Sequence, residues 1–239
     1  YTRDIDPHDP DQQVVFGTSG HRGSALDNAF NEAHILATTQ AIVDYRRGEN
    51  ITGPVCIGRD THALSEPAMV SALEVLIGNE VPVRVDAAGR NTPTPAVSHA
   101  ILTHPGGGAD GIVVTPSHNP PRDGGFKYNP PTGGPAPAEA TDWIAARANE
   151  YIAGGLSGVK RSSVSGVLDE RAERFDYLDH YVSDLDSVVD MDAIKASGLR
   201  IGADPMGGAS VDYWGAIGER YGLNLEVVNP HVDATWRFM

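Results

Sequence analysis

The sequence predicts an α/β fold with a mixed, mostly parallel sheet sandwiched by helices, followed by the start of a second α/β domain. Short apolar, β-branched runs alternate with helical patterns across residues 52–115. Parallel strands need such helical crossovers, so the alternation indicates a largely parallel sheet covered on both faces. Loops rich in glycine and proline follow these strands, at the sheet edge where ligands usually bind. The strand-helix-strand pattern then starts again after residue 195.

The first domain is expected to span residues 1–195. Ser65 and Thr94 are predicted N-caps, and each precedes a proline and a run of apolar residues at helical spacing. Gly154–Gly166 is predicted to be a connector, because it is rich in glycine and serine. The predicted strands lie at residues 14–16, 55–57, 83–87, 112–114 and 126–128. The predicted helices start after Asn31, near Ser65 and near Thr94, and span residues 139–152 and 171–189.

The second domain is expected to start at residue 196 and to continue to residue 239. A strand at 199–203, a helix at 208–220 and a strand at 223–228 form one strand-helix-strand unit. A unit of this size cannot bury its own sheet face. We therefore expect the chain to be the first part of a longer protein.

The composition excludes some classes of partner. The 239 residues carry a net charge of −14, which disfavours binding to nucleic acid and to anionic membranes. No apolar run approaches the roughly 20 residues that span a bilayer. The single cysteine, Cys56, lies in an apolar run and is expected to be buried, which fits a reducing compartment. We therefore expect a cytoplasmic protein. A small phosphorylated substrate is compatible with the negative net charge if the Lys and Arg residues gather locally. The oligomeric state is not predicted.

The segment GIVVTPSHNPPRDGGFKYNP, residues 111–130, presents Ser117 on a stiff loop. Prolines on both sides restrict the backbone after an apolar strand. A hydrolase triad is disfavoured because the segment lacks the G-x-S-x-G elbow. Neighbouring side chains of an extended segment also point to opposite sides, so His118 is poorly placed to be the base for Ser117. Phosphoryl transfer through the hydroxyl suits the segment better.

Lys127 is the second candidate of this segment. A turn at Gly124 and Gly125 would return the chain along the strand, and Lys127 would face away from its aromatic neighbours Phe126 and Tyr128. The lysine would then lie near Ser117. An ordinary surface lysine is the alternative.

The loop GTSGHRG, residues 17–23, is a candidate anion site. Its glycines allow close backbone approach, the hydroxyls of Thr18 and Ser19 can donate, and Arg22 matches phosphate oxygens. A glycine-rich turn with solvated His21 and Arg22 is an equally good interpretation. The pair Arg59 and Asp60, directly after another strand, is either a local ion pair or a ligand contact.

With these segments the chain resembles the bacterial phosphoglucomutases of the α-D-phosphohexomutase superfamily. Together the matching segments cover most of the chain in order, which makes the resemblance specific. They are FGTSGHRG (16–23), IGRDTHALSEPA (57–68), TPTPAVSHAI (92–101), VVTPSHNPPRDGGFKYNPP (113–131) and DPMGGASVDYWGAI (204–217).

The resemblance implies a chemistry for these residues. Ser117 would be the phosphoserine nucleophile, with Arg22 and Lys127 assisting proton and charge movements and His118 beside the phosphate. Glucose 1-phosphate and glucose 6-phosphate would interconvert through glucose 1,6-bisphosphate, which is both intermediate and activator. Mg²⁺ would bind the phosphate on Ser117 and a D-x-D-x-D-R loop. The residues expected to contact the hexose phosphate are Thr18, Ser19, His21, Arg59 and Asn119.

The sequence departs from the family pattern by what it lacks. It contains no D-x-D-x-D-R loop, and it lacks the later sugar-binding and phosphate-binding segments of the family. We therefore expect the chain alone to have little or no mutase activity. Two alternatives stay open: a phosphomannomutase or phosphoglucosamine mutase, and a non-catalytic phosphosugar-binding module that kept the fold.

Overall fold

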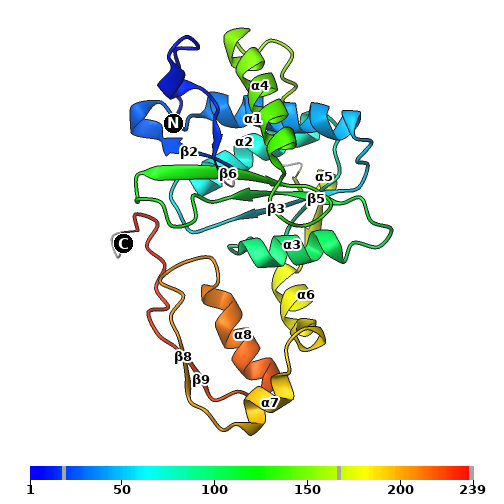
Figure 1. Cartoon of the computed structure of the whole chain (residues 1–239), viewed down its shortest axis with the longest axis vertical. Helices are drawn as coiled ribbons and strands as arrows, with labels where there is room; N and C mark the ends of the chain where they lie inside the picture. The colour runs from blue at the N-terminus through cyan, green and yellow to red at the C-terminus, as the bar shows by residue number, and fades with distance from the viewer. Residues whose placement is uncertain (18–19, 166–167, 237–239) are drawn as a thin grey trace.

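The computed structural model describes residues 1–17, 20–165 and 168–236, and its main feature is a mixed seven-stranded sheet (Figure 1). The strand order is β1-β2-β6-β5-β3-β4-β7. The strands are β1 (Phe16–Gly17), β2 (Gly20–Ser24), β3 (Val55–Arg59), β4 (Val83–Asp86), β5 (Asp110–Val114), β6 (Asp123–Asn129) and β7 (Ala172–Phe175). Strands β5, β3, β4 and β7 run parallel, whereas β6, β2 and β1 add in antiparallel fashion. The predicted mixed α/β sheet is therefore confirmed.

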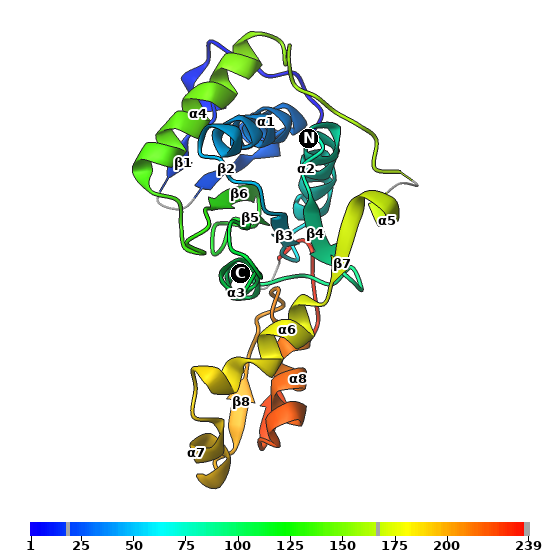
Figure 2. The same ribbon diagram turned by 90° about the vertical axis from the view of Figure 1, so that its right-hand side faces the viewer.

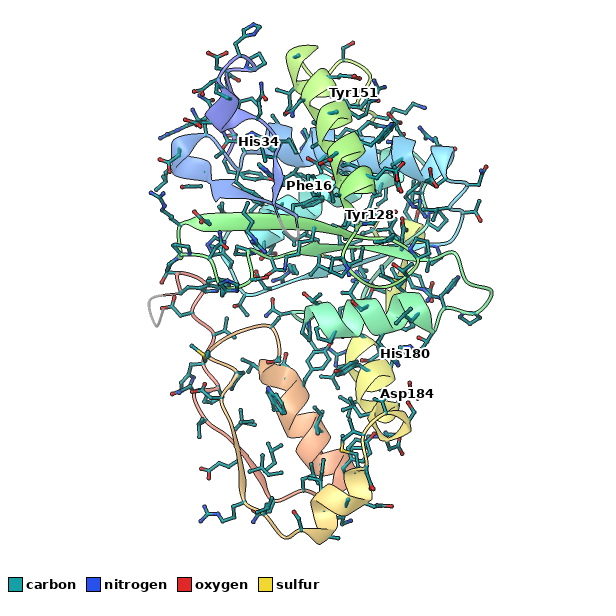
Figure 3. All side chains as sticks on the ribbon, in the orientation of Figure 1. Phe16, His34, Tyr128, Tyr151, His180 and Asp184 are labelled. Carbon is teal, nitrogen blue, oxygen red and sulfur yellow. The ribbon has the colours of Figure 1, made fainter. Side chains whose placement is uncertain are left out.

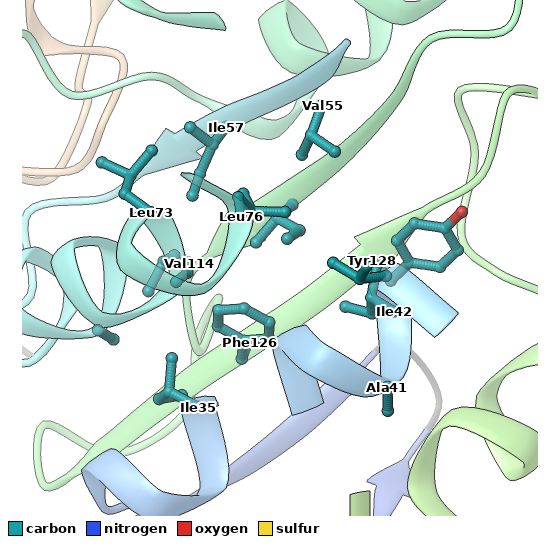
Figure 4. Packing of buried hydrophobic residues seen from close by; sticks show 14 of the residues in the cluster. Ile35, Ala41, Ile42, Val55, Ile57, Leu73, Leu76, Val114, Phe126 and Tyr128 are labelled. Carbon is teal, nitrogen blue, oxygen red and sulfur yellow. The ribbon is translucent and has the colours of Figure 1, made fainter. Parts of the chain in front are cut away.

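Three helices cover one face of this sheet, namely α1 (Glu32–Gly48), α2 (Ser65–Gly78) and α4 (Ala138–Ala153) (Figure 2). Alternate residues of the strands point into this layer, where they pack against apolar helix residues. Figure 4 shows Phe126 and Tyr128 of β6 facing Ile35 and Ile42 of α1. Burial of these apolar side chains is the main stabilising contribution to the fold. Each Å² of apolar surface removed from water contributes about 25 cal/mol.

A charged group is also buried under α1. The Arg46 guanidinium donates to both carboxylate oxygens of Asp110, at 3.0 and 2.8 Å, and the Tyr128 hydroxyl donates to the same carboxylate at 2.8 Å. Asp110 is fully buried and Arg46 is nearly so. Burial raises the pKa of Asp110 to about 6, although Arg46 and Tyr128 act in the opposite direction.

The opposite face of the sheet is covered by α3 (Thr94–Leu102) and α6 (Tyr177–Ser183). Cys56 is buried in this layer, as its apolar run predicts. His99 of α3 contacts Asp184 at 2.7 Å, and Figure 3 shows Asp184 and His180 at the far side of α3 from the sheet. Both predicted N-caps are wrong by one residue: Ser65 and Thr94 are the first residues of their helices.

The predicted helix at 171–189 is wrong. A short helix α5 (Leu168–Arg171) leads into strand β7, and α6 starts only at Tyr177. β7 pairs in parallel with β4, and Arg84 of β4 contacts Glu173 at 2.6 Å and stacks on the ring of Phe175. Charged residues are compatible with a strand at the edge of a sheet, so the polar sequence of β7 gave no sign of a strand.

The second unit consists of α7 (Met191–Ala196), β8 (Ile201–Ala203), α8 (Val211–Tyr221) and β9 (Leu225–Val227). β8 and β9 pair in parallel, so the predicted strand-helix-strand order is confirmed. This unit is joined to the first through α6, where the Tyr221 hydroxyl donates to the Val182 carbonyl at 2.6 Å. Within the described ranges no helix combines the length and the apolar character that a membrane span requires.

Candidate active site

The loop between β5 and β6, residues 115–122, is called the serine loop. Ser117 lies on it with φ of 62°, in the left-handed region that side-chain-bearing residues rarely adopt. Its amide donates to the Thr115 hydroxyl at 3.0 Å, and the Asn119 amide donates to the Pro116 carbonyl. The extended backbone assumed from the sequence is therefore wrong, and both Ser117 and His118 face one cavity. Residues held in such strained conformations cluster at functional sites.

Lys127 is the closest polar partner that the structure gives Ser117. Its amine lies 2.5 Å from the Ser117 hydroxyl oxygen, and its side chain is only 8% exposed. Lys127 pairs with Val113 of β5, on the face opposite the core-facing Phe126 and Tyr128. Burial lowers the pKa of Lys127, the Arg22 charge lowers it further, and Asp60 opposes both. A larger fraction of neutral amine at a given pH suits proton exchange with the hydroxyl.

Arg22 joins the same face of the sheet. It lies opposite Gly125 in the β2–β6 pairing, which places it diagonally next to Lys127. The neighbouring Gly20 leaves room for the lysine, because a Cβ atom there would lie 2.7 Å from the Lys127 Cγ. Lys127 contacts Ser117 and Arg22 lies next to Lys127, so two positive charges gather on this face of the sheet, an arrangement that can bind an anion.

Gly125 allows the serine loop to lie directly on β6. A Cβ atom at this position would lie 2.2 Å from the Thr115 carbonyl oxygen and 2.5 Å from Pro116 backbone atoms. Gly125→Ala is therefore expected to lower the free energy of unfolding by about 1–3 kcal/mol, the usual cost of overpacking. Denaturant titration checks this, with Gly134→Ala as control, since a Cβ atom there meets nothing within 4 Å. Equal stability of the two variants would contradict the close packing.

The cavity beside Ser117 has a volume of about 370 Å³ and lies between the two units. Asp60, residues 92–94 and the serine loop line one side. Residues 205–206 and 208–210, just before α8, and Trp236 line the other. A cavity of this size, between loops at the carboxyl ends of parallel strands, matches the place where α/β proteins bind small ligands.

Asp60 supplies a buried carboxylate to this cavity. One carboxylate oxygen accepts from the His62 amide at 3.0 Å and from the Ser65 hydroxyl at 2.5 Å. The other is buried without a hydrogen-bond partner among the residues that the structure describes. Asp60 is therefore structural for the start of α2 and also adds negative charge that opposes the lowering of the Lys127 pKa.

The structure does not support the substrate contact predicted for His21. The ring is 2% exposed and stacks between Phe30 and His34, at centroid distances of 6.0 and 5.3 Å. Burial and the neighbouring His34 lower the pKa of His21 to about 4, so the ring is neutral. The reason is strand alternation: when Arg22 faces the cavity side, its neighbour must face the core.

The other residues predicted to contact the substrate lie in different places. Arg59 donates to the Asn91 side chain at 2.8 Å and to the Gly89 carbonyl at 3.4 Å, and among the described residues it neither pairs with Asp60 nor lines the cavity, so neither role expected for it is found. Asn119 donates to Asp123 at 3.1 Å and closes the serine loop. Thr18 and Ser19 lie outside the described residues. Reasoning from sequence missed Trp236 as a cavity residue, because no local signal ties it to the serine loop.

Comparisons with known proteins agree with this geometry. The family model described as phosphoglucomutase/phosphomannomutase, alpha/beta/alpha domain I, matches residues 13–153. A phosphoglucomutase of Komagataeibacter xylinus is 56% identical over 244 residues, covering 100% of this chain and 44% of that protein. A phosphoglucosamine mutase of Deinococcus radiodurans is 30% identical over 204 residues, covering 83% of this chain and 41% of that protein.

The fold agrees as well. The open form of parafusin, a phosphoglucomutase from Paramecium, superposes with a TM-score of 0.77 at 21% identity, covering 98% of this chain and 46% of that one. The chain thus spans less than half the length of these relatives. Because the family model covers more than half of the chain, and strands β1 to β6 and the serine loop lie within it, the chain belongs to the phosphoglucomutase/phosphomannomutase family.

Proposed function

We propose that this chain is the phosphate-carrying part of a phosphoglucomutase and that Ser117 is the carrier. The observation that supports this most is the 2.5 Å contact between the Lys127 amine and the Ser117 hydroxyl. The two groups lie beside a cavity of about 370 Å³, which suits a hexose phosphate. The reaction is the interconversion of glucose 1-phosphate and glucose 6-phosphate through glucose 1,6-bisphosphate.

Lys127 moves the serine proton in this proposal. When Ser117 accepts phosphate, its oxygen bonds to phosphorus and the neutral Lys127 amine takes the hydroxyl proton, while the bond from phosphorus to the sugar oxygen breaks and the released sugar oxygen takes up a proton from water. When phosphate returns to the sugar, the attacking sugar hydroxyl releases its proton to water and the Lys127 ammonium gives its proton back to the serine oxygen. The phosphoserine carries a charge of about −1.5 to −2 at neutral pH, which Arg22 and Lys127 offset. His118 lines the same cavity, and its proposed position is beside the phosphate on Ser117.

Mg²⁺ is the proposed metal, and this chain supplies only one part of its site. Within the described ranges no group of three or more His, Cys, Asp or Glu residues could hold a metal ion. The residues present therefore do not form a magnesium site by themselves. The proposed ligand from this chain is the phosphate on Ser117, and further carboxylates would have to come from elsewhere.

Two further parts of the proposal concern the context of the enzyme. The net charge of −14 disfavours nucleic acid and anionic membranes, and the local cations Arg22 and Lys127 support a hexose phosphate as the partner. A cytoplasmic location is proposed with it. Turnover by the chain alone is expected to be very low, because a transferable phosphate must be kept from water and the sequence lacks the later sugar-binding and phosphate-binding segments of the family. Rapid conversion of glucose 1-phosphate by the purified chain would contradict this.

Phosphate acceptance tests the function. The chain is incubated with Mg²⁺ and the 1,6-bisphosphates of glucose, mannose and glucosamine in turn, and its intact mass is followed. We expect the mass to rise by one phosphoryl group, fastest with glucose 1,6-bisphosphate. A faster gain with mannose or glucosamine bisphosphate would favour the related mutases. Saturable binding of bisphosphate without any gain in mass would favour the non-catalytic module.

A further inference from the structure

The stretch after β9, residues 228–236, returns from the second unit to the first, as the red end of the ribbon in Figure 1 shows. The Ala63 amide donates to the Ala234 carbonyl at 3.0 Å. The Trp236 indole N–H donates to the Thr61 hydroxyl at 3.1 Å, and that hydroxyl donates to the Gly207 carbonyl at 2.9 Å. Segments far apart in the sequence are thus joined at one buried point.

Local structure aims Trp236 at this point. The Asp233 carboxylate accepts from the Thr235 amide at 2.9 Å and from its hydroxyl at 2.6 Å, and the Trp236 amide donates to the Asp233 carbonyl. Trp236 itself has φ of 51°, a conformation that a bulky residue adopts only when its surroundings enforce it. Its side chain is 4% exposed.

His62 connects Trp236 to the serine loop. The two rings meet edge to face, with centroids 5.1 Å apart. The Nδ1 atom of His62 accepts from the Leu64 amide at 3.2 Å, so the neutral ring carries its proton on Nε2. That Nε2–H donates to the Pro121 carbonyl at 2.6 Å. Pro121 lies four residues after Ser117 on the same loop.

We propose that Trp236 and His62 form a clasp that positions the serine loop, and thereby Ser117, for phosphoryl transfer. The clasp consists of Thr61, His62, Trp236 and the Pro121 carbonyl. This inference rests on the proposed function for its catalytic consequence. His62 and Trp236 hydrogen-bond to Pro121 and Thr61 and not to Ser117, so both are positioning residues. Loss of the clasp lowers the rate of phosphate transfer more than the affinity for bisphosphate, because the cations that bind phosphate stay in place.

Two substitutions of His62 separate positioning from mere packing. His62→Gln keeps an N–H at the position of Nε2 and retains the bond to Pro121. His62→Asn keeps only an acceptor at the position of Nδ1 and loses that bond. Trp236→Leu removes the indole donor and the ring, and Trp143→Leu is the matched control, since Trp143 is 44% exposed on α4.

Hydrogen-deuterium exchange followed by mass spectrometry measures how fast the backbone amides of the serine loop exchange, in peptides that cover residues 115–122. His62→Asn and Trp236→Leu are expected to speed exchange there by up to about tenfold, the equivalent of one lost hydrogen bond. His62→Gln and Trp143→Leu are expected to leave it unchanged. Peptides from β5 and α1 report global folding, and their exchange is expected to stay slow. The milder substitution Trp236→Phe, which removes the N–H donor but keeps an aromatic ring, replaces Trp236→Leu if the latter unfolds the chain.

The exchange experiment needs no sugar phosphate, so it is independent of the proposed function. Faster exchange of the serine loop in His62→Asn, with rescue in His62→Gln, supports the clasp even if Ser117 never accepts phosphate. Phosphate acceptance slowed by His62→Asn and restored by His62→Gln adds the catalytic consequence. Unchanged exchange of the serine loop in both His62→Asn and Trp236→Leu would overturn the clasp.

Discussion

Lys127→Met is expected to slow phosphate transfer to Ser117 by about 10²–10⁴-fold, the usual contribution of a positioned acid or base. Methionine keeps the apolar stem of the side chain and removes the amine that lies 2.5 Å from the Ser117 hydroxyl. The rate is measured as the gain of intact mass after rapid mixing with glucose 1,6-bisphosphate. Lys160→Met is the control, because Lys160 is exposed and does not line the serine cavity.

The pH dependence of this rate identifies the role of the amine. Burial and the Arg22 charge lower the pKa of Lys127, so a larger fraction of the amine is neutral at a given pH. Transfer to Ser117 uses the neutral amine, so its rate should rise with pH and level off above the lowered pKa. The Lys127→Met variant should lose this dependence. If Lys127→Met retains both the rate and the pH profile of the unsubstituted chain, Lys127 is excluded as the base.

Arg46→Met is expected to lower the free energy of unfolding by about 3–5 kcal/mol at neutral pH, because it leaves a buried carboxylate without its charged partner. Asp110 is fully buried, and both of its carboxylate oxygens accept from the Nε–H of Arg46. Arg47→Met, one residue further along α1, is the control. Its side chain is 53% exposed and contacts Asp44 at 3.4 Å, so a loss of at most about 1 kcal/mol is expected.

The destabilisation caused by Arg46→Met is also expected to depend on pH. Because burial raises the pKa of Asp110 to about 6, the folded chain holds a proton that the unfolded chain releases near pH 4. Stability should therefore decrease as pH rises through this window. The cost of Arg46→Met should be smallest near pH 4, where the carboxyl group is neutral, and largest above pH 6. Denaturant titrations at several pH values check this, and a cost independent of pH would contradict it.

Strands buried on both faces were predictable from sequence, because their apolar runs are continuous. Residues 55–57 and 112–114 were placed correctly for this reason. β7 was not, since its exposed Glu173 and Arg174 resemble the polar face of a helix, and its pairing with β4, which includes the contact between Arg84 and Glu173, stabilises it as a strand. Edge strands are recognised through their partners, which the local sequence does not contain.

The candidate site shows the same division. The pattern of two aromatic residues around Lys127 predicted its face correctly, because alternation is a local property. The loop around Arg22 was ambiguous, since a shift by one residue exchanges the faces of His21 and Arg22. Trp236 could not be found at all, because its contact with Thr61 spans 175 residues.

The central claim is that Ser117 carries the phosphate, and mapping the phosphate tests it most directly. The chain is treated with glucose 1,6-bisphosphate and Mg²⁺, digested, and sequenced by tandem mass spectrometry, next to Ser117→Ala and to Ser163→Ala as an exposed control serine. The phosphate is expected on Ser117 in the unsubstituted chain and in Ser163→Ala, and nowhere in Ser117→Ala. Phosphate on another residue, or an undiminished mass gain in Ser117→Ala, would contradict the claim.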